Sequence, residues 1–276
     1  IIVNIKKVKK KKSFYLLYKE LKRLRSFGPY DLVIDMQSLI KSAIISRLIP
    51  SKLTLGFDNS SSRESLASIF YNKTFKLGYD ENIIERNFKL ISFALDLPVK
   101  LEELSNKLPF LYSEKKHLNI NLSNFKKIIV LIPGASFASK QYPVENFAEV
   151  THLLDANYLI IWGNDKEKLL ADKIKNLAPH VNICEKLSIE CLISLISQVD
   201  LIIGPDTGPT HIGWALNVPS ITLFGPTPGY RNTLVTANNK IIESESDVNP
   251  YRIDKNDYSI SSINAIEVVE IAKSLL

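Results

Sequence analysis

The sequence predicts an α/β fold with parallel sheets, and two features of the chain support this. Apolar runs of strand length alternate with segments whose apolar residues recur at helical spacing. Largely apolar strands that alternate with helices are typical of a parallel sheet covered on both faces. The length of 276 residues is sufficient for two domains. We place these domains at residues 1–115 and 116–276.

The elements of the first domain follow from periodicity and from helix-stop signals. Gly28 and Pro29 end the first helix, and Pro98 ends the last one. The Ser-Ser-Arg-Glu sequence of residues 61–64 predicts a capping box at the start of a helix. The predicted elements are helices at 13–26, 38–49, 66–70 and 81–97, and strands at 32–35 and 52–57.

A polar, irregular stretch at residues 101–124 is interpreted as the linker between the domains. The second domain then alternates strands and helices. Asn264 and Glu267 predict a capping box at the start of the final helix. This helix could cross back to pack on the first domain. The predicted strands are 128–133, 158–163, 181–184, 199–204 and 220–225, and the predicted helices are 144–155, 165–177, 188–198, 210–216 and 264–276.

The composition is that of an ordinary globular protein, with 45% hydrophobic and 23% charged residues. It excludes a disordered chain and a disulfide scaffold. No apolar run approaches the roughly 20 residues that a membrane-spanning helix needs. The two cysteines, Cys184 and Cys191, are interpreted as reduced core thiols, because their spacing fits no zinc pattern.

Positive charge is concentrated at the start of the chain. Residues 1–26 contain ten Lys and Arg and a single acid, Glu20, although the whole chain has a net charge of only +6. Such a cluster suits a phospholipid surface, a phosphorylated lipid or a nucleic acid. A solvated helix face explains it equally well. Because no aromatic RNA-binding motif or zinc finger accompanies it, we expect no nucleic-acid partner.

Parallel sheets bind ligands at the carboxyl ends of their strands, so the site is expected in the loops that follow the strands. The loop at residues 133–143 is rich in small residues, carries Lys140 and leads into a helix. Its backbone N–H groups can approach an anion, and Lys140 can pair with a phosphate. A plain connecting loop with a surface lysine explains the same residues. The Gly-Lys-Ser/Thr of a Walker A loop is missing.

The loop at residues 205–211 carries a second set of candidates. Asp206 can cap the following helix, and Thr207 and Gly208 expose N–H groups at the start of that helix. The cap alone would explain Asp206. His211 in the first turn, at the carboxyl end of a strand, favours a ligand site.

Two further loops are predicted at the same edge. Glu167 lies early in a helix, where it either offsets the helix dipole or accepts hydrogen bonds from sugar hydroxyls. Residues 224–228, Phe-Gly-Pro-Thr-Pro, are interpreted as a simple chain reversal. Together the loops indicate a site for a diphosphate-linked ligand. No Gly-x-Ser-x-Gly sequence is present, and the four histidines are too scattered for a metal site.

Taken together, these loops resemble the lipopolysaccharide heptosyltransferases, a glycosyltransferase family with two facing Rossmann-like domains (GT-B). The first domain resembles the type I enzyme, which adds the first heptose. The matching segments are residues 133–136, 140–143, Gly163 with Glu167, 206–211 and 224–227 in the second domain, and 35–43, 63–64 and 70–72 in the first.

The resemblance implies a site for the donor ADP-L-glycero-β-D-manno-heptose, with no cofactor and no metal. Lys140 would stabilise the ADP leaving group. Ala135 stands where some relatives have threonine, so only its backbone could contribute. The implied donor-binding residues are Ala135, Ser136 and Lys140 for the diphosphate, Glu167 and Leu187 near the ribose and adenine, and Asp206, Thr207, Gly208 and His211 around the phosphates and the heptose.

The resemblance also implies an inverting transfer to Kdo on lipid A, with Lys41 and Arg63 contacting this anionic acceptor. The enzyme would act at the cytoplasmic face of the inner membrane, held there by the basic residues 6–25. The family's glycine-rich loop and its proposed general-base aspartate have no counterpart in the chain. We therefore expect the first strand–helix unit of the N-terminal domain to be missing before Ile1, and a chain that truly begins there to be inactive.

Four alternatives stay open at this point. The chain could add the second heptose, use another nucleotide sugar, bind a nucleotide without catalysing transfer, or bind nucleic acid through its N-terminal lysines. The donor loops alone do not separate them.

Overall fold

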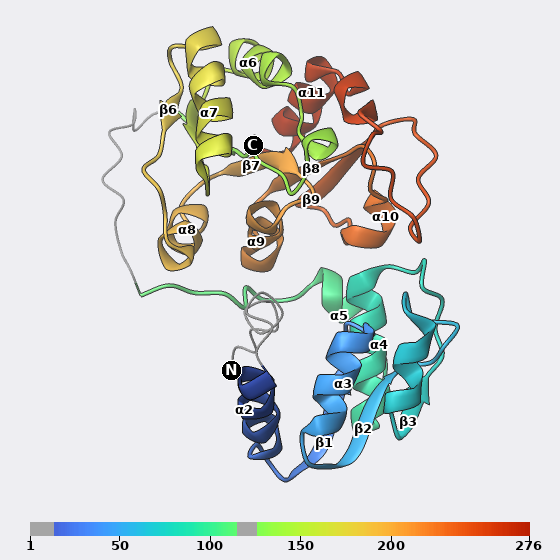
Figure 1. The fold of residues 1–276 in the computed structure, drawn as a ribbon. Coiled ribbons are helices and arrows are strands. Elements are labelled where there is room, and N and C mark those ends of the chain that lie inside the picture. The colour runs from blue at the N-terminus through green and yellow to red at the C-terminus, as the bar shows by residue number, and fades with distance from the viewer. Residues whose placement is uncertain (1–13, 115–125) are drawn as a thin grey trace. The chain divides into compact units, whose positions relative to one another are not determined.

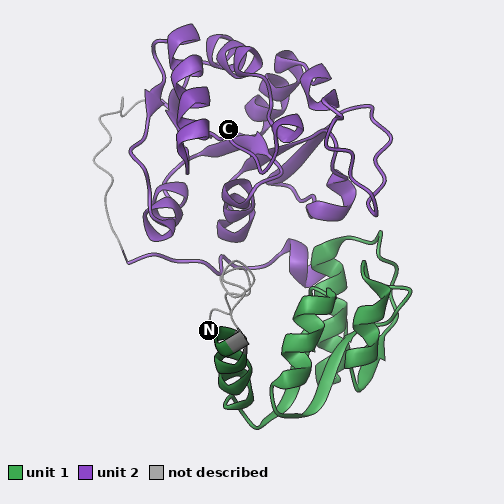
Figure 2. Ribbon diagram, viewed as in Figure 1, with its two compact units in different colours: residues 1–100 green, residues 101–276 purple. Residues whose placement is uncertain are grey.

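A computed structural model describes residues 14–114 and 126–276 (Figure 1). It divides into two compact units, residues 1–100 and 101–276 (Figure 2). The second unit therefore includes residues 101–114, which the sequence analysis assigns to the linker and the first domain. Hydrogen bonds explain this, because the Phe110 N–H donates to the carbonyl of Ala215 and the Asn217 amide donates to the carbonyl of Lys107. The predicted basic residues 6–12 lie outside the described residues.

The first unit contains a three-stranded parallel sheet with strand order β1-β2-β3. Leu90 of the long helix α4 packs with Leu55 and Phe57 of β2 in its core. Helix α3 contacts β1, β2 and the 3-10 helix η1. The elements are α2 (Phe14–Arg25), β1 (Tyr30–Asp35), α3 (Ile40–Leu48), β2 (Ser51–Phe57), η1 (Ser65–Phe70), β3 (Lys73–Phe75) and α4 (Ile83–Leu95).

The capping box predicted at residues 61–64 is wrong. Glu64 precedes η1 without a side-chain cap, and Ser62 donates to the carbonyl of Asp58. The Glu64 carboxylate instead accepts a hydrogen bond from the Ile40 N–H at 2.7 Å, at the start of α3. Tertiary contact therefore redirects this carboxylate to a helix far away in the sequence.

Asp35 ends β1 as a buried carboxylate surrounded by donors. Its Oδ2 accepts from Tyr71 Oη at 2.8 Å and from Ser42 Oγ at 2.7 Å, and its Oδ1 accepts from the Gln37 N–H at 2.9 Å. Tyr71 reaches it by lying against Gly56, where a Cβ atom would be only 2.4 Å from the tyrosine ring. Burial, followed by the hydrogen bond to Asp35, raises the pKa of Tyr71 above its usual range.

The second unit is built on a six-stranded parallel sheet with strand order β6-β5-β4-β7-β8-β9. The strands are β4 (Ile128–Leu131), β5 (Asn157–Ile160), β6 (Asn182–Ile183), β7 (Leu201–Pro205), β8 (Ser220–Phe224) and β9 (Asn239–Glu243). The helices are α5 (Glu102–Ser105), η2 (Ala138–Lys140), α6 (Val144–Leu153), α7 (Asp165–Leu177), α8 (Ile189–Ile196), α9 (Gly208–Leu216), α10 (Gly229–Asn232), η3 (Ser259–Ser262) and α11 (Ala265–Leu275).

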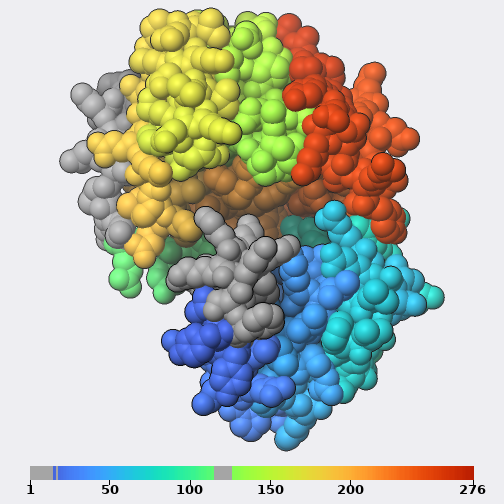
Figure 3. Space-filling model, in the orientation of Figure 1, coloured from blue at the N-terminus to red at the C-terminus, as the bar shows by residue number. Residues whose placement is uncertain are grey.

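Alternate residues of the central strands fill two cores on opposite faces of this sheet. Ile129 and Leu131 of β4 face the core formed with α6, α7 and α11, which lie side by side (Figures 1 and 3). Val130 of β4 faces the core formed with α8 and α9. Both faces are thus covered, which confirms the predicted parallel α/β architecture and explains why these strands are continuous apolar runs in the sequence.

Several details differ from or refine the expected elements. Strands β3 and β9 and helices α5 and α10 lie where the sequence analysis expects no strand or helix. Helix α11 packs against α6 and β8, and its buried face belongs to the second unit's core. Asn264 caps this helix by accepting from the Ile266 N–H. No helix of the described ranges is both long and apolar enough to cross a membrane.

Replacing Gly56 with alanine should destabilise the first unit by about 1–3 kcal/mol, the usual cost of overpacking. The added Cβ displaces the Tyr71 ring and breaks its bond to Asp35. Urea denaturation measures the loss. Gly208→Ala is the control, because nothing lies within 4 Å of its Cβ position. Equal stability of the Gly56→Ala and wild-type chains would contradict the packing of the Tyr71 ring against Gly56.

Candidate functional site

The site lies where the strand order of the second sheet reverses. From β4 the chain proceeds outward through β5 and β6, and then returns to the other side of β4 with β7, β8 and β9. Ligands of open parallel sheets bind at such a switch point, outside the carboxyl ends of the strands. The loops after β4 and β7 meet there.

The loop after β4 is anchored on both sides of its lysine. Lys140 ends the short helix η2, and the neighbouring Ser139 hydroxyl donates to the carbonyl of Lys255 at 2.8 Å. Tyr142 is buried in the core, and its hydroxyl donates to the carbonyl of Ile263 at 2.9 Å. These bonds hold Lys140 in a buried position, whereas the sequence left a surface lysine as an alternative.

Asp206 brings the loops of the second unit together. Its Oδ2 accepts from Lys140 Nζ at 2.8 Å, and its Oδ1 accepts from His211 Nε2 at 2.9 Å. Two more donors reach Oδ2: Thr227 Oγ1 at 3.1 Å and Asn232 Nδ2 at 3.2 Å. We call these five residues the Asp206 cluster. The cap predicted as a sufficient explanation for Asp206 is not formed, since Thr207 is the N-cap of α9 and has no side-chain cap bond.

The electrostatics of the cluster keep Asp206 ionised. Its side chain is 11% exposed and that of Lys140 10%. Burial alone would raise the pKa of Asp206, but the hydrogen bond from His211 and the positive charge of Lys140 hold it well below the usual range. Three of the four donors bond to Oδ2, and the fourth, His211, bonds to Oδ1. Asp206 is therefore a fixed anion and is unsuited to accept a proton as a base.

His211 and the start of α9 form the open side of the site. Because an ionised carboxylate only accepts hydrogen bonds, the Nε2 of His211 carries the hydrogen that it shares with Asp206. Its Nδ1 takes part in no described hydrogen bond, and the side chain is 37% exposed. Gly208, the first residue of α9, is exposed and has open space where a Cβ would lie. The N-terminus of α9 is thus accessible to an anion.

Glu167 joins the loops after β4 and β5. Its side chain packs against Gly134, where a Cβ atom would be 2.5 Å from the glutamate carboxyl carbon. Both of its oxygens are engaged at the start of α7, with the Gly163 N–H at 2.7 Å and the Asn164 amide at 2.6 Å. The structure therefore shows the helix-start role of Glu167, and its contact with a ribose stays a prediction.

The remaining predicted donor residues lie on the same edge of the sheet. Leu187 is half-buried between β6 and α8, where it packs, like Cys184, against the core that contains Val130 of β4. Ala135 and Ser136 precede Lys140 in the loop after β4, and Thr207 follows Asp206. Among the predicted residues, direct contacts connect Lys140, Asp206 and His211.

Thr227 and Asn232 are the residues that the sequence analysis missed. Thr227 lies in the segment interpreted as a chain reversal, yet its buried hydroxyl reaches Asp206. Its position just beyond the carboxyl end of β8 was the sequence feature that could have marked it as a site residue. Asn232 ends α10, an unpredicted helix, so no sequence feature pointed to it.

The predicted acceptor residues Lys41 and Arg63 lie in the first unit and are exposed. The hydrogen bond between Glu64 and the Ile40 N–H places their sequence neighbours side by side. Their contact with an anionic acceptor stays a prediction.

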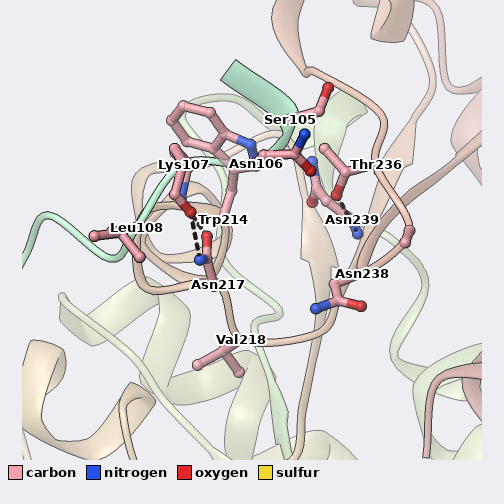
Figure 4. Close-up of a pocket in the computed structure, with 11 residues that line it drawn as sticks. Ser105, Asn106, Lys107, Leu108, Trp214, Asn217, Val218, Thr236, Asn238 and Asn239 are labelled. Atoms are coloured by element: carbon pink, nitrogen blue, oxygen red, sulfur yellow. Dashed lines mark hydrogen bonds between the residues drawn. The ribbon is translucent and has the colours of Figure 1, made fainter. Parts of the chain in front are cut away.

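A cavity of about 410 Å³ lies at the opposite edge of the second sheet (Figure 4). There Lys107 Nζ donates to Asn217 Oδ1 and lies 4.5 Å from the centre of the Trp214 ring. Burial lowers the pKa of Lys107. The Asn239 N–H also donates to Thr236 within this cavity. The contacts of Lys107 tie the segment at 105–110 to the C-terminal end of α9.

The two cysteines match their interpretation as free thiols. Cys184 and Cys191 are unpaired and partly buried, and burial raises the pKa of Cys184 to about 11. Within residues 14–114 and 126–276, no group of three or more His, Cys, Asp and Glu is placed to hold a metal ion.

A buried Lys–Asp pair, a histidine and an open helix N-terminus lie together at the switch point of a Rossmann-like sheet, which is where such folds bind ligands. Residues 17–257 match the model of glycosyltransferase family 9 (heptosyltransferase). The chain therefore belongs to glycosyltransferase family 9, the heptosyltransferases.

Curated relatives agree with this family. The chain is 39% identical over 265 residues to lipopolysaccharide heptosyltransferase 1 of Campylobacter coli, a match that covers 89% of this chain and 76% of the relative. The corresponding protein of Pseudomonas aeruginosa is 28% identical, over 73% of this chain and 56% of its own length. Lipooligosaccharide heptosyltransferase 2 of Campylobacter jejuni is 30% identical, over 76% of this chain and 63% of its own length. The chain thus spans between about half and three quarters of these relatives.

The fold is also that of a solved heptosyltransferase. The Escherichia coli heptosyltransferase WaaC with ADP matches with a TM-score of 0.77 and 23% identity, over 100% of this chain and 83% of that one. This confirms the predicted α/β fold class of the GT-B heptosyltransferases.

Replacing Asp206 with asparagine should lower the free energy of unfolding by about 3 kcal/mol at neutral pH, because Lys140 is left buried without its counter-charge. The folded-state pKa of Asp206 is lower than its ordinary value of 3.8, so its contribution is present above that value and is lost as the pH falls below it. The difference between the two proteins should therefore narrow in acid.

Denaturant unfolding at neutral pH and at about pH 3 measures this effect. Asp200→Asn is the matched control, because Asp200 pairs with Lys127 at the exposed amino edge of the same two strands. Its loss should stay below about 1 kcal/mol for the ion pair. A difference for Asp206→Asn that does not change with pH would contradict the electrostatic interpretation.

Proposed function

We propose that the chain transfers L-glycero-D-manno-heptose from ADP-heptose to a Kdo residue of the lipopolysaccharide inner core, as a heptosyltransferase I, with inversion and without a metal ion. The observation that carries this proposal is the Asp206 cluster at the switch point between β4 and β7. It positions one ammonium group and one imidazole beside the open N-terminus of α9.

The proposed chemistry is a direct displacement at the anomeric carbon. The acceptor oxygen forms a bond to this carbon while the bond to the β-phosphate oxygen breaks, and the electron pair stays on the departing ADP. A carboxylate base takes the acceptor proton. Asp206 is not this base, because the hydrogen bond from His211 and the positive charge of Lys140 keep its pKa low. Lys140 and the start of α9 would stabilise the charge that develops on ADP.

One relative supports addition of the first heptose rather than the second. Identity is 39% to a heptosyltransferase 1 and 30% to a heptosyltransferase 2. Addition of the second heptose remains the alternative that the latter relative supports. Assays with paired acceptors, one with Kdo only and one with Kdo that already carries a heptose, distinguish the two.

The donor class has support from a second solved structure. The Escherichia coli heptosyltransferase WaaC has also been solved with ADP-2-deoxy-2-fluoro heptose, an analogue of ADP-heptose. A donor of this kind has the diphosphate for which Lys140 and the start of α9 are suited. We therefore propose ADP-heptose, rather than another nucleotide sugar, as the donor of this chain.

The anionic acceptor would be recognised by the first unit. Lys41 and Arg63 are exposed cations in one region, next to the contact between Glu64 and Ile40. Helix α2 adds further basic residues, the exposed Lys19, Lys22 and Arg25. We propose that this charge holds the protein at the cytoplasmic face of the inner membrane, beside phosphorylated lipid.

Lys140→Ala should lower kcat for heptose transfer by about 100-fold, the usual loss when one donor to a developing anion is removed. The control is Lys127→Ala, which breaks the pair that bridges β4 and β7 at their opposite ends and should leave transfer unchanged. A chelator should also leave the rate unchanged. Undiminished transfer by Lys140→Ala would count against the leaving-group role.

The double variant Lys41→Ala/Arg63→Ala should raise the KM for the Kdo–lipid A acceptor by about tenfold, if each lost charge contact contributes a typical surface value. Calorimetry should find its affinity for ADP unchanged, because the donor loops belong to the second unit. The exposed Arg47→Ala serves as a charge control on α3. An unchanged acceptor KM would remove both residues from the acceptor site.

A further inference from the structure

The hydrogen-bond donors to Asp206 are distributed unevenly between its two carboxylate oxygens. His211 alone bonds to Oδ1 among the described contacts, whereas Lys140, Thr227 and Asn232 all donate to Oδ2. Two neutral donors therefore duplicate the contact that the lysine makes. For the resting protein this is redundant, because the buried ion pair already satisfies the oxygen.

The two additional donors become important when a second anion binds to Lys140. A diphosphate at the start of α9 would compete with Asp206 for the ammonium group. If Lys140 were the only donor to Oδ2, its movement would leave a buried carboxylate oxygen without a partner, at the full desolvation cost. Thr227 and Asn232 keep that oxygen hydrogen-bonded, and they add no charge that would itself attract the ligand.

Both neutral donors are held by their own surroundings. Thr227 is buried with 7% exposure in the turn between two prolines. Asn232 ends α10, whose first N–H, that of Gly229, donates to Glu243 Oε1 at 2.8 Å. The Asn232 Oδ1 accepts from Arg231 at 3.3 Å, which turns its NH₂ group toward Asp206. Neither contact depends on Lys140.

We propose that Thr227 and Asn232 are positioning residues that retain Asp206 while Lys140 turns toward the diphosphate of the donor. This inference rests on the proposed function. It assigns the loop after β8 and helix α10 a part in donor binding through Lys140 rather than through direct contact with the ligand.

A double-mutant cycle tests the inference, with ADP as the probe and calorimetry as the measurement. Thr227→Val/Asn232→Leu removes both donors at nearly constant volume. In the wild-type background we expect the Kd for ADP to rise about tenfold, the loss typical of a hydrogen bond to a charged group. In the Lys140→Ala background we expect a change of less than about twofold, because no ammonium group remains to be released. Thr227→Ser keeps the hydroxyl and should restore wild-type affinity at that position.

Equal losses in the two backgrounds would overturn the inference, because a merely structural role does not depend on Lys140. Failure of the wild-type chain to bind ADP at all would overturn the proposed function itself. ADP binding with additive losses would overturn only the positioning role.

If Thr227→Val/Asn232→Leu does not fold, a second variant tests the positioning role instead. Asn232→Asp is isosteric, but it places a second carboxylate against Asp206, among Lys140, His211 and Arg231. Its ADP affinity should be reduced at neutral pH and should recover toward about pH 5, where the pair of carboxylates holds a shared proton. A pH dependence equal to that of the wild type would overturn the inference.

Discussion

The buried ion pair between Lys140 and Asp206 is the interaction on which the candidate site depends. It joins the loops that follow β4 and β7, the two strands between which the sheet reverses its order. A buried pair of this kind contributes little net stability, because desolvation offsets most of the attraction. Its consequence is geometric: it holds one cation at the carboxyl edge of the sheet.

The architecture around the pair explains how the protein keeps a charged group inside. The lysine loop is anchored by Ser139 and Tyr142 to the segment that leads into α11. The aspartate is enclosed by donors from α9, the loop after β8 and α10. A site assembled from several strand ends can vary one loop without losing the others, as is common for parallel α/β folds.

The amino edges of the same strands offer an instructive contrast. Lys127 and Asp200 also bridge β4 and β7, at 3.0 Å, but both side chains are substantially exposed. Solvent screens that pair and leaves its charges free to hydrate. Two Lys–Asp pairs on the same two strands thus differ in character because the surrounding loops bury one edge and not the other.

The parallel α/β class, most elements of the second unit and the family could be predicted from the amino-acid sequence alone, because apolar strands and small-residue loops are local patterns. The same patterns marked Lys140, Asp206 and His211 as site residues. These patterns did not indicate β3, α5, β9 and α10, whose short segments have weak periodicity, and they wrongly predicted a capping box at residues 61–64.

The contacts of the site, in contrast, were visible only in the folded chain. Asp206 pairs with Lys140 instead of capping α9, Glu64 binds the start of α3, and Thr227 and Asn232 reach the site from later loops. Each of these outcomes depends on which segments meet in space. Hydrogen bonds between distant loops leave no periodic pattern in a single chain, so no inspection of neighbouring residues could have found them.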